Sequence, residues 1–199
     1  VARFTGQSRN ITTYLLHVAR EIRLGDGPAA RFLLVPPGRH RGTEIREFYL
    51  VYLRRILEAS RGKIDIVLTG DDFGAQHGLL VAKETWRRLL RPGFAEYLAL
   101  IRRHGCKSMH HTCGSVAHLI PDLIELGVDA LNPVQVSAKG MDTKTLKREF
   151  GKDITFWGGG CNTQGVLNRG TPAEVEREVA RRVRDFAPGG GFVFTQVHN

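Results

Sequence analysis

The chain has 199 residues, of which 42% are hydrophobic and 25% charged, and its formal net charge is +9. This composition is ordinary for a globular protein, and no apolar run approaches the roughly 18 residues that a membrane span needs. We therefore do not expect a membrane protein. Lys and Arg are scattered, without a basic run or zinc-finger spacing, so we do not expect a nucleic-acid-binding protein either. Three cysteines without an export signal do not indicate a disulfide framework, and we expect a cytoplasmic protein.

The first 44 residues give few structural signals. A Gly- and Pro-containing break at 25–28 and a Pro- and Gly-rich stretch at 36–42 leave one predicted helix, over residues 11–22. We therefore treat residues 1–44 as a poorly specified N-terminal segment and residues 45–199 as the folded domain.

From residue 45 onward, helical periodicity alternates with short apolar runs. Asp142 is expected to cap a short helix, and Thr171 with Glu174 forms a predicted capping box around Pro172. The predicted helices cover about 45–57, 86–101, 119–126, 142–150 and 171–187. The predicted strands are 64–69, 107–113, 128–132, 154–158 and 192–197.

Strands that alternate with helices at this spacing predict parallel βαβ units, in either a barrel or an open doubly wound sheet. The polar residues favour the barrel, because they follow all five strands, and a barrel gathers every C-terminal strand end around one site. We predict an α/β fold: a (β/α)8 TIM barrel, incomplete in this chain, with about five C-terminal βα units. The residues after the strands are Asp71 and Asp72, His111 and Cys113, Asn132 and Gln135, Cys161 and Asn162, and His198 and Asn199.

A candidate metal site lies at the end of the second predicted strand. Side chains alternate along a strand, so His111 and Cys113 share one face, and imidazole nitrogen and thiolate sulfur are zinc ligands. A catalytic zinc has three protein ligands and an open position. His198 is the preferred third ligand and Cys161 the second choice. The alternative is a Cys that fills core space beside a His hydrogen-bonded to the backbone.

Two adjacent carboxylates, Asp71 and Asp72, follow the first predicted strand and suit a general acid or a partner for a cationic or N–H group. Loop capping is the structural alternative. Glycines 158–160 let backbone amides approach a carboxylate or phosphate of a ligand, although a strand-to-loop turn also explains them.

Seven motifs together resemble the uroporphyrinogen decarboxylase-like superfamily, over about residues 45–199. They are Gly-Asp-Asp-Phe-Gly-Ala-Gln at 70–76, His-Thr-Cys-Gly-Ser at 111–115, Ile-Pro-Asp-Leu-Ile at 120–124, Asp-Ala-Leu-Asn-Pro-Val-Gln at 129–135, Trp-Gly-Gly-Gly-Cys-Asn-Thr-Gln at 157–164, Gly-Thr-Pro-Ala-Glu at 170–174, and His198-Asn199.

The resemblance implies a (β/α)8 barrel and two kinds of chemistry. Zinc-dependent corrinoid methyltransferases of the superfamily bind zinc through a His-x-Cys pair and a later Cys, and His111, Cys113 and His198 occupy the matching positions, with His in place of the last Cys. In true decarboxylases, which need no metal, an Asp at the barrel mouth holds pyrrole N–H groups and a His near the final strand contacts a substrate carboxylate. Asp71 or Asp72 and His198 could take these roles.

We therefore expect a zinc-dependent enzyme of the methyltransferase-like branch, acting on a small-molecule or tetrapyrrole or corrinoid substrate, with a corrinoid as partner cofactor. A corrinoid protein and a homodimer are the expected partners. The alternatives are a uroporphyrinogen III decarboxylase of porphyrin and heme biosynthesis, and a non-catalytic tetrapyrrole-binding module. The expected catalytic residues are Asp71, Asp72 and His198, the metal ligands His111, Cys113 and His198, and the substrate contacts Gln76, Asn132, Gln135, Gly159 and Gly160.

Overall fold

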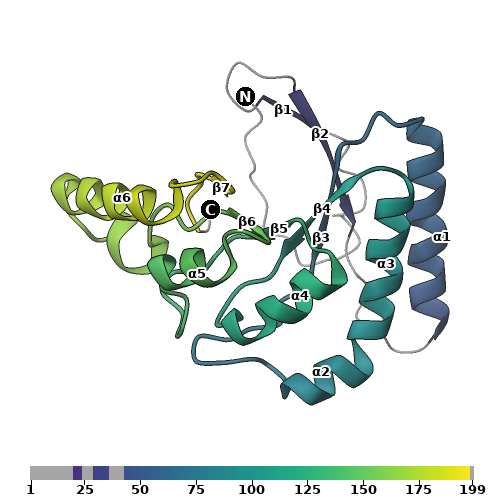
Figure 1. Ribbon diagram of the computed structural model, residues 1–199, viewed down its shortest axis with the longest axis horizontal. Helices are drawn as coiled ribbons and strands as arrows, with labels where there is room; N and C mark the ends of the chain where they lie inside the picture. The colour runs from purple at the N-terminus through teal and green to yellow at the C-terminus, as the bar shows by residue number, and fades with distance from the viewer. Residues whose placement is uncertain (1–19, 24–28, 36–42, 198–199) are drawn as a thin grey trace.

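The structure is a computed structural model that describes residues 20–23, 29–35 and 43–197 (Figure 1). In this part of the chain, seven strands form one sheet whose spatial order follows the sequence. Strands β2 to β7 pair in parallel, and β1 pairs antiparallel with β2. The strands are β1 (Arg20–Arg23), β2 (Ala29–Val35), β3 (Ile66–Gly70), β4 (Lys107–His111), β5 (Ala130–Asn132), β6 (Thr155–Trp157) and β7 (Phe192–Val193).

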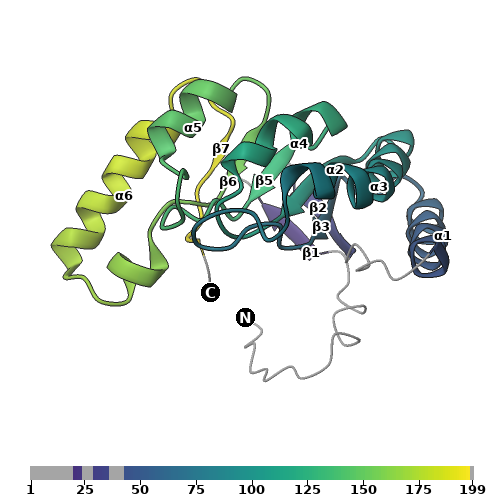
Figure 2. The ribbon, with the colours of Figure 1, turned by 90° about the horizontal axis from the view of Figure 1, so that it is seen from below.

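Every parallel connection from β2 to β7 contains at least one helix. In Figure 2 the helices follow one side of the curved row of strands. A doubly wound sheet reverses its strand order at a switch point, whereas a barrel keeps the order of the chain. The unbroken order therefore confirms the predicted barrel architecture, incomplete in this chain. The helices are α1 (Thr43–Ser60), α2 (Lys83–Leu89), α3 (Arg91–Arg103), α4 (Ile120–Leu126), α5 (Thr143–Phe150) and α6 (Pro172–Phe186).

The structure corrects the prediction for the N-terminal segment. Residues 20–22, predicted as the end of a helix, lie in β1, and the rest of that predicted helix falls outside the described residues. Strand β2 was not predicted, yet it pairs in register with β3, with Phe32 opposite Ile66. Its run Phe-Leu-Leu-Val carries the signal of a short parallel strand, which the Pro- and Gly-rich flanks obscured.

The single helix predicted over 86–101 is two helices, α2 and α3. Leu90 separates them, and Pro92 follows in the first turn of α3. A proline lacks the N–H of a helix interior and restricts the residue before it, so a new helix begins there. The strands are also shorter than predicted: β4 ends at His111 and β7 at Val193.

The structure confirms the two N-terminal helix caps that the sequence predicted. Asp142 accepts a hydrogen bond from the backbone of Thr145, and Thr171 and Glu174 form a complete capping box.

Between sheet and helices lies the main core, which includes the fully buried side chains of Trp86, Tyr97, Leu131, Phe156 and Phe186. A smaller cluster of Met109, Ala130 and Trp157 lies separately from it. No helix in the described part of the chain is long and apolar enough to cross a membrane.

Candidate metal centre

Three potential ligands meet at the C-terminal rim, by which we mean the strand ends and loops that follow β3 to β7. The parallel register places Gly70, His111 and Asn132 side by side at the ends of β3, β4 and β5. Asp72 lies two residues beyond Gly70, and Cys113 lies two residues beyond His111. The register therefore brings Asp72 to the His-x-Cys pair.

The donor atoms of Asp72, His111 and Cys113 all lie within 4.8 Å of one another. The Sγ of Cys113 is 3.5 Å from the Nε2 of His111. A tetrahedral zinc with Zn–S of about 2.3 Å and Zn–N of about 2.0–2.1 Å holds such atoms about 3.6 Å apart. The spacing and the N, S and O donor set both fit a zinc ion.

Asn132 fixes the orientation of the His111 ring. Its Nδ2 donates to the carbonyl of Trp157 at 3.0 Å, so its Oδ1 is the acceptor that faces His111 Nδ1 at 2.7 Å. His111 must then carry its proton on Nδ1, which leaves the lone pair of Nε2 directed at the cluster. Hydrogen bonds of this kind orient the His ligands of metal sites.

The loop that bears Cys113 is held by its own backbone amides. The N–H of Cys113 donates to Asp72 Oδ1, and the N–H of Gly114 donates to Gln135 Oε1, both at 2.8 Å. Gly114 has φ of +87°, and a Cβ there would meet the backbone of Gly74 at 2.3 Å. The two glycines let the β3 and β4 loops touch backbone to backbone, and so they help to set the distance from Asp72 to Cys113.

Burial, and next to it the charge of Asp72, raises the pKa of the Cys113 thiol to about 12. The metal-free thiol is therefore protonated at neutral pH. A metal that binds there must displace this proton, because only the thiolate is a strong ligand.

His110 has a different environment from its neighbour, as the alternation of a strand requires. It is fully buried between the rings of Phe73 and Phe94, with centroids 5.0 and 4.6 Å away, and its Nδ1 lies 2.9 Å from Thr69 Oγ1. Burial, and next to it the charge of His111, lowers the pKa of His110 to about 3. His110 is thus a neutral core residue, whereas His111 is half-buried at the rim.

A cavity of about 350 Å³ opens beside the cluster. His111, Asn132 and Trp157 line it together with Thr195 and Gln196, which follow β7. A small ligand in this cavity would contact the same His111 ring that offers a metal ligand.

Two of the predicted substrate contacts are bonded to each other. Gln135 Nε2 donates to Gln76 Oε1 at 3.0 Å, and the Gln76 amide donates to the carbonyl of Ser137. Ser137 Oγ in turn donates to Gln164 Oε1 at 2.6 Å. These bonds join the loops after β3, β5 and β6 along the rim.

Backbone packing accounts for the predicted contacts Gly159 and Gly160. Both are buried, and the N–H of Gly160 donates to the carbonyl of Thr195 at 2.8 Å. A Cβ at Gly160 would lie 2.5 Å from the ring of Phe194. The role of these two glycines in substrate binding stays a prediction.

The remaining predicted ligands lie apart or outside the described residues. His198, predicted as metal ligand and catalytic residue, lies outside them. Cys161, the second choice for the third ligand, is not a member of the cluster, and its role as a ligand stays a prediction. It is buried, and its pKa is raised by burial and then by Glu178 of α6, so its thiol is near an outer helix. Sequence reasoning took Asp72 only as an acid, because its proximity to Cys113 depends on the β3–β4 register.

The fold and this site define a partial (β/α) barrel with a candidate metal centre at its C-terminal rim. The family model described as uroporphyrinogen decarboxylase (URO-D) matches residues 43–199. The chain belongs to the uroporphyrinogen decarboxylase family. A comparison with curated protein sequences finds no match.

Solved structures show the same fold at low identity. A methyltransferase from Methanosarcina mazei has a TM-score of 0.55 at 16% identity, over 75% of this chain and 40% of its own length. A D-psicose 3-epimerase gives 0.53 at 12%, over 84% and 64%. Dihydropteroate synthase from Anaplasma phagocytophilum gives 0.51 at 10%, over 83% and 66%. The chain therefore spans less than two-thirds of each of these proteins.

Proposed function

We propose that the chain is the metal-binding part of a zinc-dependent, methyltransferase-like enzyme of the family. The observation that carries the proposal is the convergence of His111 and Cys113 at tetrahedral spacing, with Asn132 holding the imidazole in the tautomer that can bind a metal. His198 is the third ligand predicted from the sequence.

Zinc bound there would supply a Lewis acid that lowers the pKa of a coordinated thiol. The chain's own residues position the reaction. His111 and Cys113 hold the ion. Asn132 orients the His111 ring, and the hydrogen bonds of the Cys113 and Gly114 backbone amides keep the Cys113 loop in place. Asp71 and Asp72 remain the proposed acidic residues at the mouth. Gln76, Gln135, Gly159 and Gly160 remain proposed substrate contacts through the rim loops.

The methyltransferase reading is supported by the His-x-Cys donor pair and by one similar structure, which is described as a methyltransferase. The family model covers the entire site and is compatible with both candidate chemistries. The proposal includes a small-molecule, tetrapyrrole or corrinoid substrate, a corrinoid protein as partner, and a homodimer.

Elemental analysis of the purified full-length protein, combined with an assay of methyl transfer from methylcobalamin to a thiol, tests the proposal. We expect about one zinc per chain, and loss of transfer when the zinc is removed by a chelator and recovery when it is added back. A protein that transfers the methyl group equally well without zinc contradicts the proposal.

Decarboxylation of a tetrapyrrole is the second candidate, because the matching family model is described as uroporphyrinogen decarboxylase. In this case the metal-free protein consumes uroporphyrinogen. Replacing the mouth-facing carboxylate, Asp71 or Asp72, with Asn then lowers turnover by about 10² while stability stays unchanged. Lost stability with unchanged turnover would assign that Asp to loop capping. Absence of turnover in both assays would leave a binding module.

A further inference from the structure

The carboxylate of Asp72 has a place in the metal centre that the sequence alone did not assign. We propose that Asp72 is a third protein ligand of the metal, beside His111 and Cys113. This inference rests on the proposed zinc function and deepens it.

The first argument is geometric. Each of the three residues offers a donor atom, and all of these atoms lie within 4.8 Å of one another. Asp72 Oδ1 already accepts the backbone N–H of Cys113 at 2.8 Å, which holds the carboxylate next to the thiol. A carboxylate offers about four lone-pair sites on two oxygens, so it can keep this hydrogen bond and ligate a metal as well.

The second argument is charge. A neutral imidazole, one thiolate and one carboxylate carry a total charge of −2, which balances a divalent cation. A site with His111, Cys113 and His198 alone would carry only −1. Asp72 therefore supplies the anionic charge that a second thiolate would otherwise bring.

The third argument is coordination number. A catalytic zinc has three protein ligands and keeps one position for substrate. Asp72, His111 and Cys113 provide these three within the described residues, so that Asp72 takes the place predicted from the sequence for His198. The half-buried His111 lines a cavity of about 350 Å³. This cavity offers space for a substrate beside the site.

Zinc affinity, measured on the full chain by competition with a chromophoric chelator, tests the inference without any activity assay. We expect Asp72→Asn to weaken zinc binding by at least about 100-fold, the upper end of what loss of a supporting residue costs. Asn keeps an oxygen that can accept the Cys113 N–H, so the loop is retained, and a thermal melt checks that the variant folds. Asp71→Asn is the matched control: it removes the same charge one residue away, and we expect an effect below about fivefold.

A second variant distinguishes the loss of a metal ligand from a general disturbance of the loop, because it should add a spectroscopic signal. In Asp72→Cys loaded with Co²⁺, the sulfur-to-cobalt charge-transfer band should gain intensity over the parent, because a second thiolate enters the coordination sphere. Equal zinc affinity in Asp72→Asn and the parent, or an unchanged cobalt band in Asp72→Cys, overturns the inference. If Asp72→Asn binds zinc as tightly as the parent while Cys113→Ser loses zinc, the zinc function stands and only the role of Asp72 fails. If the parent binds no zinc, both fail.

Discussion

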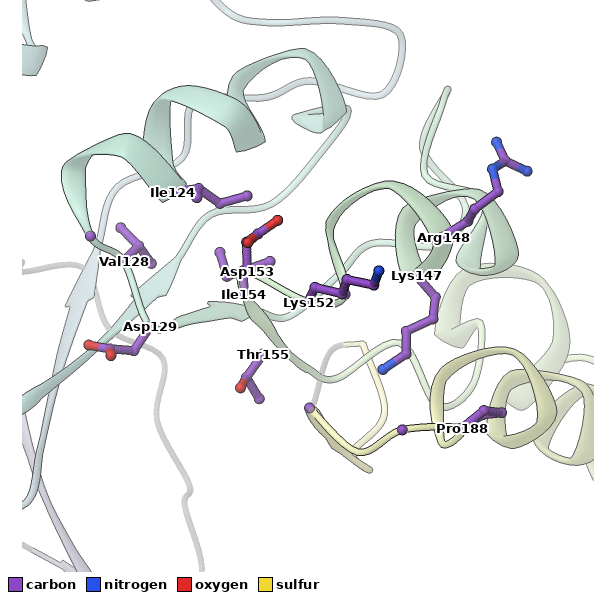
Figure 3. A pocket seen from close by; sticks show the side chains of 14 residues that line it. Ile124, Val128, Asp129, Lys147, Arg148, Lys152, Asp153, Ile154, Thr155 and Pro188 are labelled. Carbon is purple, nitrogen blue, oxygen red and sulfur yellow. The ribbon is translucent and has the colours of Figure 1, made fainter.

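The two ends of the sheet differ in a way that cavity size does not reveal. At the N-terminal rim, where β5, β6 and β7 begin, lies a cavity of about 710 Å³, twice the volume of the one beside His111. Figure 3 shows Lys147 extending from α5 toward the turn that contains Pro188, with Lys152 beside it. Yet only the smaller cavity, at the C-terminal rim, adjoins a set of converging donors.

Two charged residues at the N-terminal rim, Lys147 and Asp129, make bonds that stabilise local structure. Lys147 Nζ donates to the carbonyl of Gly190, and Asp129 binds Lys107 at 2.8 Å and the backbone of Ser108. At the C-terminal rim, by contrast, the hydrogen bonds of Asn132 and Gln135 leave the His111 and Cys113 donors facing each other. Strand ends of a parallel barrel converge at both rims, but among the described residues the converging group of His, Cys and carboxylate donors lies at the C-terminal rim.

The largest expected effect is at the cluster itself. Cys113→Ser or His111→Ala should remove the zinc and abolish methyl transfer, because either change leaves an incomplete coordination sphere. Metal content and turnover of the purified variants measure this. Cys106→Ser is the control, since its thiol lies at the start of β4 and donates to the carbonyl of Ile64. Loss of zinc in the control alone would reverse the assignment of the two rims.

A smaller effect is expected at Asn132, which does not bind the metal but hydrogen-bonds the ligand His111. Asn132→Leu removes the acceptor for His111 Nδ1 and should weaken zinc binding by about 10- to 100-fold. Asn132→Asp keeps an acceptor at this position and should retain most of the affinity. Chelator competition measures both. If Asn132→Leu binds zinc as tightly as the parent, Asn132 does not position the ring.

The third prediction concerns stability away from both rims. The buried carboxylate of Asp122 on α4 binds Lys83 at 2.9 Å and Arg87 at 2.6 Å, both from α2. Burial disfavours its charge, but the bonds from Arg87 and Lys83 outweigh burial and lower its pKa below the ordinary 3.8. Asp122→Asn should therefore lower the free energy of unfolding at pH 7 by about 1–3 kcal/mol.

The pH dependence of this difference has a definite sign. Because the folded-state pKa is lowered, the stabilisation is complete above the unfolded value of 3.8 and is lost as pH falls through the folded value. Denaturant melts of parent and variant should therefore converge below about pH 4. A constant difference down to pH 2 would show that the ion pairs are not its source. Zinc affinity at pH 7 should stay unchanged.

The smallest effect is expected at the larger cavity. Lys152 is exposed on the loop after α5, so Lys152→Ala should change stability by less than about 0.5 kcal/mol. It should leave zinc affinity and methyl transfer at the parent level. A marked loss of turnover in this variant would mean that the N-terminal rim takes part in function, and the contrast between the rims would fail.

Local pattern alone determined much of this protein. Helical periodicity, the caps at Asp142 and Thr171, and the alternation of short strands with helices predicted parallel βαβ units, because each depends on residues close in sequence. The polar residues that follow the strands then favoured the barrel over an open sheet. The period of two along β4 separated His111 from His110 and paired it with Cys113. The short strand β2 was missed, since its flanking turn residues outweighed an apolar run of four.

Only the tertiary structure decided which of the polar residues after the strands meet. Asp72 joins His111 and Cys113 because β3 and β4 pair with Gly70 opposite His111, a register that no local pattern specifies. The same long-range packing turned Gln76 and Gln135 toward each other and placed the Cys161 thiol near α6. Sequence fixes the direction in which a strand points its side chains, whereas distances between strands depend on backbone hydrogen bonds between residues some 20 to 40 positions apart.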